Sequence, residues 1–165
     1  MKHYDAPWSP SLKVISLLSS VLCLSLAVTF FLLGDSVPRG VAVVPLGLLF
    51  VTVPFTIRGY VVTPKSIEVR RLFWRTRLPI EGLTSVEFNS EAMSSSIRIG
   101  GNGGMFSFSG YFLNRTLGTY RVLVTDLKRS VVLKYGTRTF VVSPSDPEDF
   151  VREVTERMTV YGSGK

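Results

Sequence analysis

The hydrophobic pattern divides the chain into an apolar N-terminal part and a C-terminal part of alternating polarity. Residues 14–33 form a run of twenty without a charge, and a helix of that length is roughly 30 Å long, the thickness of the hydrocarbon core of a membrane. A second uncharged run, residues 41–57, is at the short end of the spanning range. The pattern predicts two transmembrane helices, 14–33 and 41–57, in an anchor of residues 13–57 that follows an N-terminal tail, residues 1–12.

Both runs allow another interpretation. The first could be a cleaved signal sequence, although its apolar stretch is long for one and no small-residue cleavage site precedes Asp35. The second could be a buried helix or strand, because it contains Pro45 and Pro54. Membrane helices tolerate proline when neighbouring helices satisfy the carbonyl that it leaves free, so we retain the spanning interpretation.

The connection between the two runs predicts how they are arranged. Residues 34–40 are rich in glycine and other turn formers, and so short a link makes the helices antiparallel. The basic residues that flank the pair on the side of the termini are Lys2, Lys13, Arg58, Lys65, Arg70 and Arg71, against Arg39 alone in the link. By the positive-inside rule, both termini and the globular domain are predicted to be cytoplasmic, at a multi-pass cell membrane of bacterial type.

The remainder of the chain, residues 58–165, has the period of β-strands. It holds sixteen Lys and Arg and ten Asp and Glu, so most of the chain's net charge of +7 belongs to it. Residues 66–72 alternate, with Ile67 and Val69 on one face and Glu68 and Arg70 on the other. Further strands are predicted at residues 59–63, 75–80, 85–88, 96–99, 118–125, 130–135 and 137–143. Together they predict a meander of about seven antiparallel strands, closed as a small barrel or sandwich.

The end of the chain changes to the period of a helix. Ser145, Asp146 and Pro147 have the chemistry of a helix start, and the helix is predicted over residues 146–161. Its apolar positions are Phe150, Val154, Met158 and Tyr161, which lie on one face. We expect this face to cover the open mouth of the barrel, which makes the fold class α+β, mainly β.

The motifs of residues 97–150 resemble a known family. This segment contains the glycine-rich GGNGG, then FSGYF, a strand with the pattern G-x-Y, and the helix entry V-V-x-P-x-D-P-E-x-F. Their order is similar to that in the bacterial pleckstrin-homology-like (PH-like) domain family, in a membrane-anchored subgroup. The resemblance implies a PH-like barrel with a capping helix, which serves as a scaffold that binds lipids, peptides or proteins.

The residues that carry most enzyme chemistry are scarce in this chain. The one histidine, His3, is in the predicted tail, and the one cysteine, Cys23, is inside the first helix, so the domain cannot assemble a histidine-based catalytic set. Its carboxylates are not clustered as metal ligands. GGNGG lacks the Lys-Ser/Thr ending of a phosphate loop and is expected to be a tight loop between strands. We therefore predict no enzyme activity, no cofactor and no metal.

One basic segment stands out as a candidate binding site. Two strands meet at Phe73 and Trp74, and aromatic and basic side chains together favour contact with anionic lipid headgroups. The predicted headgroup contacts are Arg70, Arg71, Trp74, Arg75 and Arg77. The alternative is a solvated basic face that only serves topology, with Trp74 packed on the barrel.

A second candidate surface follows the glycine-rich segment. Alternation places Phe106 and Phe108 in the core, whereas Tyr111 and Phe112 follow Gly110 and are candidate contacts for a protein partner. We predict no nucleic-acid partner for an anchored domain. The sequence thus favours a non-catalytic, membrane-anchored binding or scaffold module. The alternative is a structural or regulatory subunit that assembles through its transmembrane hairpin, for which small residues at helical spacing offer only a faint signal.

Overall fold

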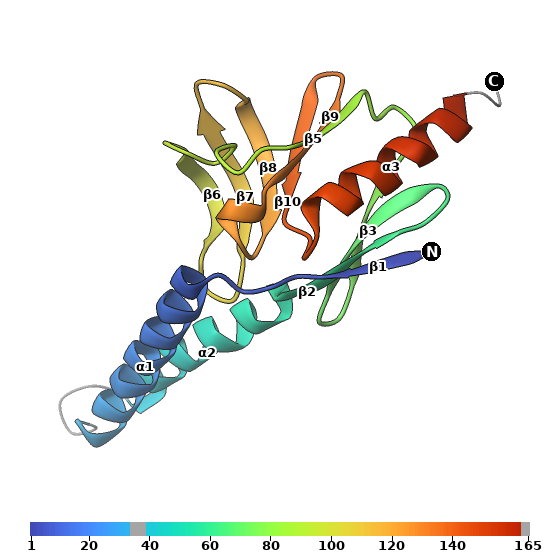
Figure 1. The fold of residues 1–165 in the computed structure, drawn as a ribbon. Helices are drawn as coiled ribbons and strands as arrows, with labels where there is room; N and C mark the ends of the chain where they lie inside the picture. Colours follow the sequence, from blue (N-terminus) through green and yellow to red (C-terminus); the bar gives the residue numbers. More distant parts are fainter. Residues whose placement is uncertain (34–38, 163–165) are drawn as a thin grey trace.

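A computed structural model describes residues 1–33 and 39–162, which form two β-sheets, a pair of N-terminal helices and a C-terminal helix (Figure 1). Helix α1 is Pro10–Leu32, and Ser9 caps it by accepting a hydrogen bond from the Leu12 amide at 3.2 Å. Helices α1 and α2 pack side by side and project from the domain as one arm. The fold is mixed and mainly β, with one long apolar N-terminal helix and a C-terminal helix. This confirms the predicted fold class in outline.

The second predicted span, residues 41–57, is shorter in the structure. After a 3₁₀ turn, Arg39–Ala42, helix α2 is only Val43–Thr52, and a second 3₁₀ turn, Val53–Phe55, leads directly into strand β2. Pro54 explains this end, because proline has no amide hydrogen and disfavours helix at the residue before it. Among the helices that the structure describes, α1 alone is long and apolar enough to cross a membrane. The predicted connection over residues 34–40 lies mostly outside the described residues.

The predicted N-terminal tail is part of the domain. Residues Lys2–Asp5 form strand β1, which pairs antiparallel with β2. Tyr4 is buried, and its ring meets that of Phe150 edge-on at 5.1 Å. A four-residue strand in a short polar segment carries too weak a pattern to be recognised without its partner.

In the part of the chain that the structure describes, ten strands form two open sheets in place of the predicted barrel of about seven. The smaller sheet has the order β1-β2-β3-β4, and the larger has the order β5-β9-β10-β8-β7-β6. The remaining strands are β2 (Ile57–Val62), β3 (Ser66–Arg71), β4 (Arg75–Pro79), β5 (Ser85–Phe88), β6 (Ile97–Gly103), β7 (Phe108–Asn114), β8 (Gly118–Val124), β9 (Val131–Tyr135) and β10 (Arg138–Val142).

The larger sheet is not a meander, because β8 and β10 pair in parallel. The chain leaves β8 through a 3₁₀ turn, Leu127–Arg129, and β9 then pairs with β5 and β10 instead of β8. Gly136, at φ 53°, makes the tight turn that returns β10 between β9 and β8.

The core lies on both faces of the larger sheet. On one face, Leu123 and Val142 pack with Ile67 and Val69 of the smaller sheet. Helix α3, Pro147–Gly162, adds Phe150 and Val154 to this cluster, whereas the side chain of Tyr161 lies outside the described part of the chain. The other face packs with the start of α1, since Leu12 is fully buried there among Phe108, Phe112, Tyr120, Val122 and Val141. The helical arm is therefore rooted in the core of the domain.

Candidate functional site

The turn between β3 and β4 lies at the base of the helical arm. β2 begins two residues after Phe55, and Ile57 pairs with Arg71, the last residue of β3. The Arg71 amide donates to the Trp74 carbonyl at 2.9 Å and closes the turn. The rings of Phe55 and Trp74 meet edge-on at 5.1 Å. Phe73, at the tip of the turn, is 75% exposed, so the hairpin presents an apolar side chain where the arm leaves the domain.

The predicted headgroup residues do not form one cluster, because successive strand residues point to opposite faces. Arg70, Arg75 and Arg77 share the outer face of the hairpin, where Glu68 accepts from Arg75 at 3.1 Å and from Arg77 at 3.0 Å. Arg71 points inward and is only 8% exposed. Its guanidinium lies 5.6 Å from the ring centres of both Phe55 and Trp74.

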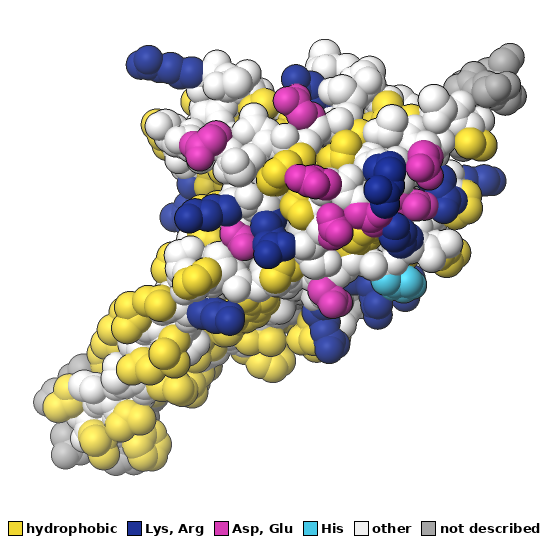
Figure 2. All heavy atoms as spheres, in the orientation of Figure 1, with side chains coloured by type: hydrophobic (Ala, Val, Ile, Leu, Met, Phe, Trp, Pro, Cys, Tyr) yellow, Lys and Arg dark blue, Asp and Glu magenta, His cyan; other side chains and the backbone are white. Residues whose placement is uncertain are grey.

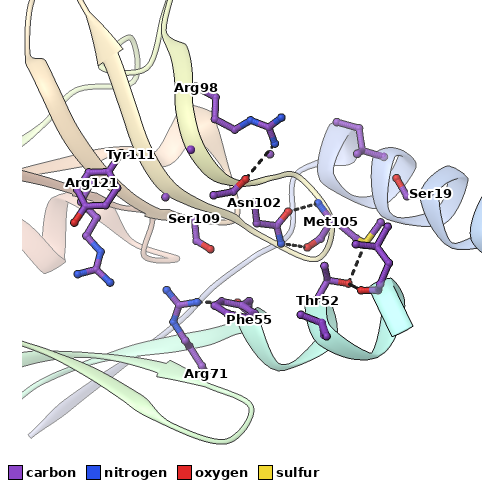
Figure 3. Close-up of a pocket in the computed structure, with 17 residues that line it drawn as sticks. Ser19, Thr52, Phe55, Arg71, Arg98, Asn102, Met105, Ser109, Tyr111 and Arg121 are labelled. Atoms are coloured by element: carbon purple, nitrogen blue, oxygen red, sulfur yellow. Dashed lines mark hydrogen bonds between the residues drawn. The ribbon is translucent and has the colours of Figure 1, made fainter. Parts of the chain in front are cut away.

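Arg71 reaches a cavity of about 820 Å³ at the junction of the arm and the two sheets (Figure 3). One wall is apolar and consists of helix residues such as Ile15, Leu48 and Val51. The opposite wall is the inner face of β6, β7 and β8. The charged residues that line the cavity are Arg71, Arg98 and Arg121, and none of the described lining residues is acidic. The cavity thus combines an apolar wall with a cationic one.

Arg71, from β3 of the smaller sheet, and Arg121, from β8 of the larger sheet, both line this cavity (Figure 3). Burial lowers the pKa of Arg71, and the positive charge of Arg121 lowers it further. Arg71 Nη1 donates to the uncharged carbonyl of Phe55 at 3.3 Å, and its buried Nε has no hydrogen-bond acceptor among the described residues. The partly desolvated guanidinium of Arg71 is therefore held near a second cation, Arg121, without a carboxylate in the cavity wall.

The turn between β6 and β7 is fixed to the arm by hydrogen bonds. Ser16 of α1 donates to the Gly104 carbonyl at 3.2 Å and accepts from the Phe106 amide at 2.9 Å. Thr52 of α2 contacts the sulfur of Met105, at 2.9 Å. The wall of the cavity on the helix side and the wall on the sheet side are thereby held in one arrangement.

The segment GGNGG, predicted to be a loop, is mostly part of strand β6. Gly110 of β7 lies so close to it that a Cβ on Gly110 would be 2.1 Å from the Gly100 carbonyl oxygen. A Cβ on Gly100, in contrast, would meet no atom within 4 Å. Since Gly100 also lines the cavity, its missing side chain leaves room there.

The two predicted partner contacts have different environments. Tyr111 is 54% exposed and lines the cavity. Phe112 is 7% exposed and packs with Tyr120 on the opposite face of the sheet, so the prediction of an exposed Phe112 is wrong. Strand β7 begins at Phe108, and its alternation directs Phe112, four residues further on, to the same buried face.

Sequence reasoning placed Phe73 at the tip of the hairpin but did not single out Arg98 or Arg121. Arg121 interrupts the apolar strand β8 and shares the face of the buried Leu123. A charge at an inward position was a signal that could have been used. The spatial relation of Arg121 to Arg71 could not be inferred, since fifty positions separate them along the chain.

Catalytic and metal-binding groups do not gather at this site. His3 is exposed in β1, within the smaller sheet and not in a separate tail. The described residues contain no group of three His, Cys, Asp or Glu side chains that could hold a metal ion.

Comparison with known proteins identifies the family. A family model of the bacterial PH domain matches residues 58–158, from β2 into α3, which is more than half of the chain. No curated protein and no solved structure matches the chain significantly. PH domains are generally binding modules without catalytic activity, and the resemblance in residues 97–150 is thus confirmed. The chain belongs to the bacterial PH domain family.

Proposed function

We propose that this protein is a non-catalytic, membrane-anchored binding module whose β3–β4 hairpin rests on an anionic membrane surface. Helix α1 crosses the membrane, and α2 lies beside it in the hydrocarbon region. Tyr111 is exposed and is the remaining candidate contact for a protein partner. Both termini and the domain are on the cytoplasmic side, as the excess of Lys and Arg near that end of the helices favours.

The surface of the arm supports a membrane environment. Side chains such as Leu17, Leu18, Phe31 and Phe50 are exposed around it. Figure 2 shows hydrophobic side chains covering the arm, while charged side chains gather on the domain. Proteins in water rarely expose so large a continuous apolar surface. Such a surface is stable when it is in contact with the hydrocarbon chains of lipids.

The proposed contact of the hairpin with the membrane rests on the length of α1 that extends beyond the domain. Because Leu12 and Ser16 are buried in the domain, the helix stands clear only over residues 17–32, which is about 24 Å at 1.5 Å per residue. The hydrocarbon core is about 30 Å thick. The helix can therefore cross only if the base of the arm, with Phe55, Phe73 and Trp74, reaches the headgroup level. Aromatic side chains are stable at that depth.

The charges of the hairpin suit an anionic surface. Glu68 offsets part of the charge of Arg75 and Arg77, while Arg70 is exposed on the same face. Each basic residue near such a surface contributes about 1 kcal/mol. The anchor already supplies localisation, so this contact orients the domain.

Fluorescence quenching in vesicles tests the depth of the hairpin. In the full chain with Trp8→Phe, Trp74 is the single tryptophan, and we expect lipids brominated near the headgroup to quench it strongly. The control chain carries Trp8→Phe, Trp74→Phe and Thr137→Trp. It places the probe in the β9–β10 turn, at the end of the domain away from the arm (Figure 1). Equal, weak quenching in both chains would contradict the proposal.

A further inference from the structure

We propose that the cavity at the base of the arm binds one anionic phospholipid, with the lipid phosphate between Arg71 and Arg121 and an acyl chain against the helices. This rests on the proposed membrane contact and adds a specific site to it. The hairpin touches the surface as a whole, whereas the cavity would hold a single molecule.

The charges in the cavity wall favour an anionic ligand. Arg75 and Arg77 have Glu68 as a partner, but the described residues give Arg121 no hydrogen bond or ion pair. Arg71 contacts one carbonyl and two aromatic rings but no carboxylate. A guanidinium that is removed from water without an opposite charge is costly. A phosphate can accept from both groups, since planar guanidinium forks match its oxygens. The Nε of Arg71 is buried and has no acceptor among the described residues, so protein groups do not saturate this guanidinium.

The apolar wall selects an anion that carries a hydrocarbon chain. Ile15, Leu48 and Val51 line the cavity and belong to the same helices whose outer surface is apolar. The cavity wall therefore continues into the surface of the arm. A phosphate held by the arginines would have its acyl chain directed along this surface, toward the hydrocarbon region. A soluble anion would leave the apolar wall uncovered.

The sheet side of the cavity leaves room for a headgroup. Gly100 contributes no side chain, and the space beside it is open to 4 Å. The volume of about 820 Å³ lies within the range of roughly 300–1,000 Å³ of small-molecule sites. Tyr111 lies at this wall, where its hydroxyl can serve a headgroup that carries hydroxyl groups.

Titration of the full chain in uncharged detergent, read by native mass spectrometry, tests the site. The probes are phosphatidylglycerol, phosphatidylcholine with the same chains, and inorganic phosphate. We expect one phosphatidylglycerol to bind saturably, and phosphatidylcholine and phosphate to bind at least about tenfold more weakly. Phosphate that binds as tightly as the anionic lipid would overturn the proposal in favour of a site for free phosphate.

Two substitutions test the site independently. Arg121→Gln removes one charge from the cavity, and Gly100→Leu fills the space at the wall without a backbone clash. Arg121→Gln should weaken phosphatidylglycerol binding by about tenfold or more, the factor of one charge-assisted hydrogen bond. Gly100→Leu should weaken it comparably, because its side chain occupies the space of the headgroup. Arg138→Gln, the matched control, changes the same charge at an exposed position outside this cavity and should alter binding by less than about twofold. Equal affinity in all four chains would overturn the proposal.

The quenching of Trp74 separates this site from the membrane contact. If Arg121→Gln and Gly100→Leu bind lipid like the unaltered chain while Trp74 is still quenched in vesicles, the cavity site is wrong and the membrane contact stands. If Trp74 is not quenched, the membrane contact itself fails, and the lipid site fails with it.

Discussion

Tyr4 donates a hydrogen bond from its hydroxyl to the carboxylate of Asp149 at 2.8 Å and so joins the N-terminal strand to the first turn of the last helix. Lys2 forms an ion pair with the same carboxylate. Both contacts hold the pKa of Asp149 below its usual 3.8. The first and last elements of the described chain are thus linked at one acidic side chain.

Asp149→Asn should change how stability depends on pH. A carboxyl whose pKa is lower in the folded state stabilises the fold above its unfolded pKa, and this contribution is lost as the pH falls through the folded value. We therefore expect the unaltered chain to be more stable than Asp149→Asn at neutral pH. The difference should begin to shrink below about pH 4 and be lost as the pH falls through the lower folded pKa. Chemical unfolding in neutral detergent at several pH values measures this. A constant difference down to pH 2 would show that the carboxylate charge is not involved.

The loss of stability should depend on which partner of the ion pairs in the hairpin is removed. Glu68 is nearly buried, while Arg75 and Arg77 are exposed. Arg75→Gln with Arg77→Gln leaves a buried carboxylate unpaired, which costs about 1–3 kcal/mol. Glu68→Gln leaves two cations in water and should cost less, about 0–1 kcal/mol. Unfolding free energies of the two chains in detergent decide this, and the opposite order would contradict the assignment of the buried partner.

Alanine substitutions at Phe112 and at Tyr111 should differ in their cost to stability, because only Phe112 is buried in the core. Phe112→Ala opens a cavity in the core on one face of the larger sheet and should cost about 3–5 kcal/mol. Tyr111→Ala removes an exposed ring from the opposite face and should cost less than about 1 kcal/mol. Thermal unfolding followed by circular dichroism measures both. Similar losses would mean that Tyr111 also contributes to the packing.

Ser16→Ala tests the connection between the arm and the β6–β7 turn. The Ser16 hydroxyl accepts from the Phe106 amide at 2.9 Å, so its removal should speed hydrogen exchange at that amide by about tenfold. Ser25→Ala is a suitable control, because that hydroxyl donates to a carbonyl of its own helix. Exchange at Phe106 that is unchanged in Ser16→Ala would show that other contacts fix the turn.

Gly110 and Gly100 provide a matched pair of backbone tests. Gly110→Ala places a methyl group 2.1 Å from the Gly100 carbonyl oxygen, at a φ of 150°, and should separate β6 from β7 and lower the unfolding temperature by several degrees. Gly100→Ala meets no atom within 4 Å and should leave that temperature nearly unchanged. Calorimetry in detergent measures both values. A stable Gly110→Ala chain would indicate that the two strands can move apart at little cost.

Features that depend on neighbouring residues were predictable from the sequence. The last helix begins as expected, because Asp146 accepts from the Asp149 amide at 3.0 Å and Pro147 occupies the first turn. Alternation correctly placed Ile67 and Val69 in the core. The order of glycine and aromatic motifs in residues 97–150 identified the family before any contact was known. Caps, turns and strand alternation act within a few residues, so the sequence carries them directly.

Contacts between segments that are distant along the chain could not be predicted from the sequence and were established only by the three-dimensional structure. The parallel pairing of β8 with β10, the strand at Lys2–Asp5 and the early end of the second helix depend on which partner each segment meets. The candidate site depends on such contacts too, since Arg71 belongs to a hairpin and Arg121 to the larger sheet. Side-chain periodicity states which face a residue occupies but not what lies opposite that face. The opposing surface is set by the packing of both sheets and the arm around a common core, and this decides that two arginines share one cavity.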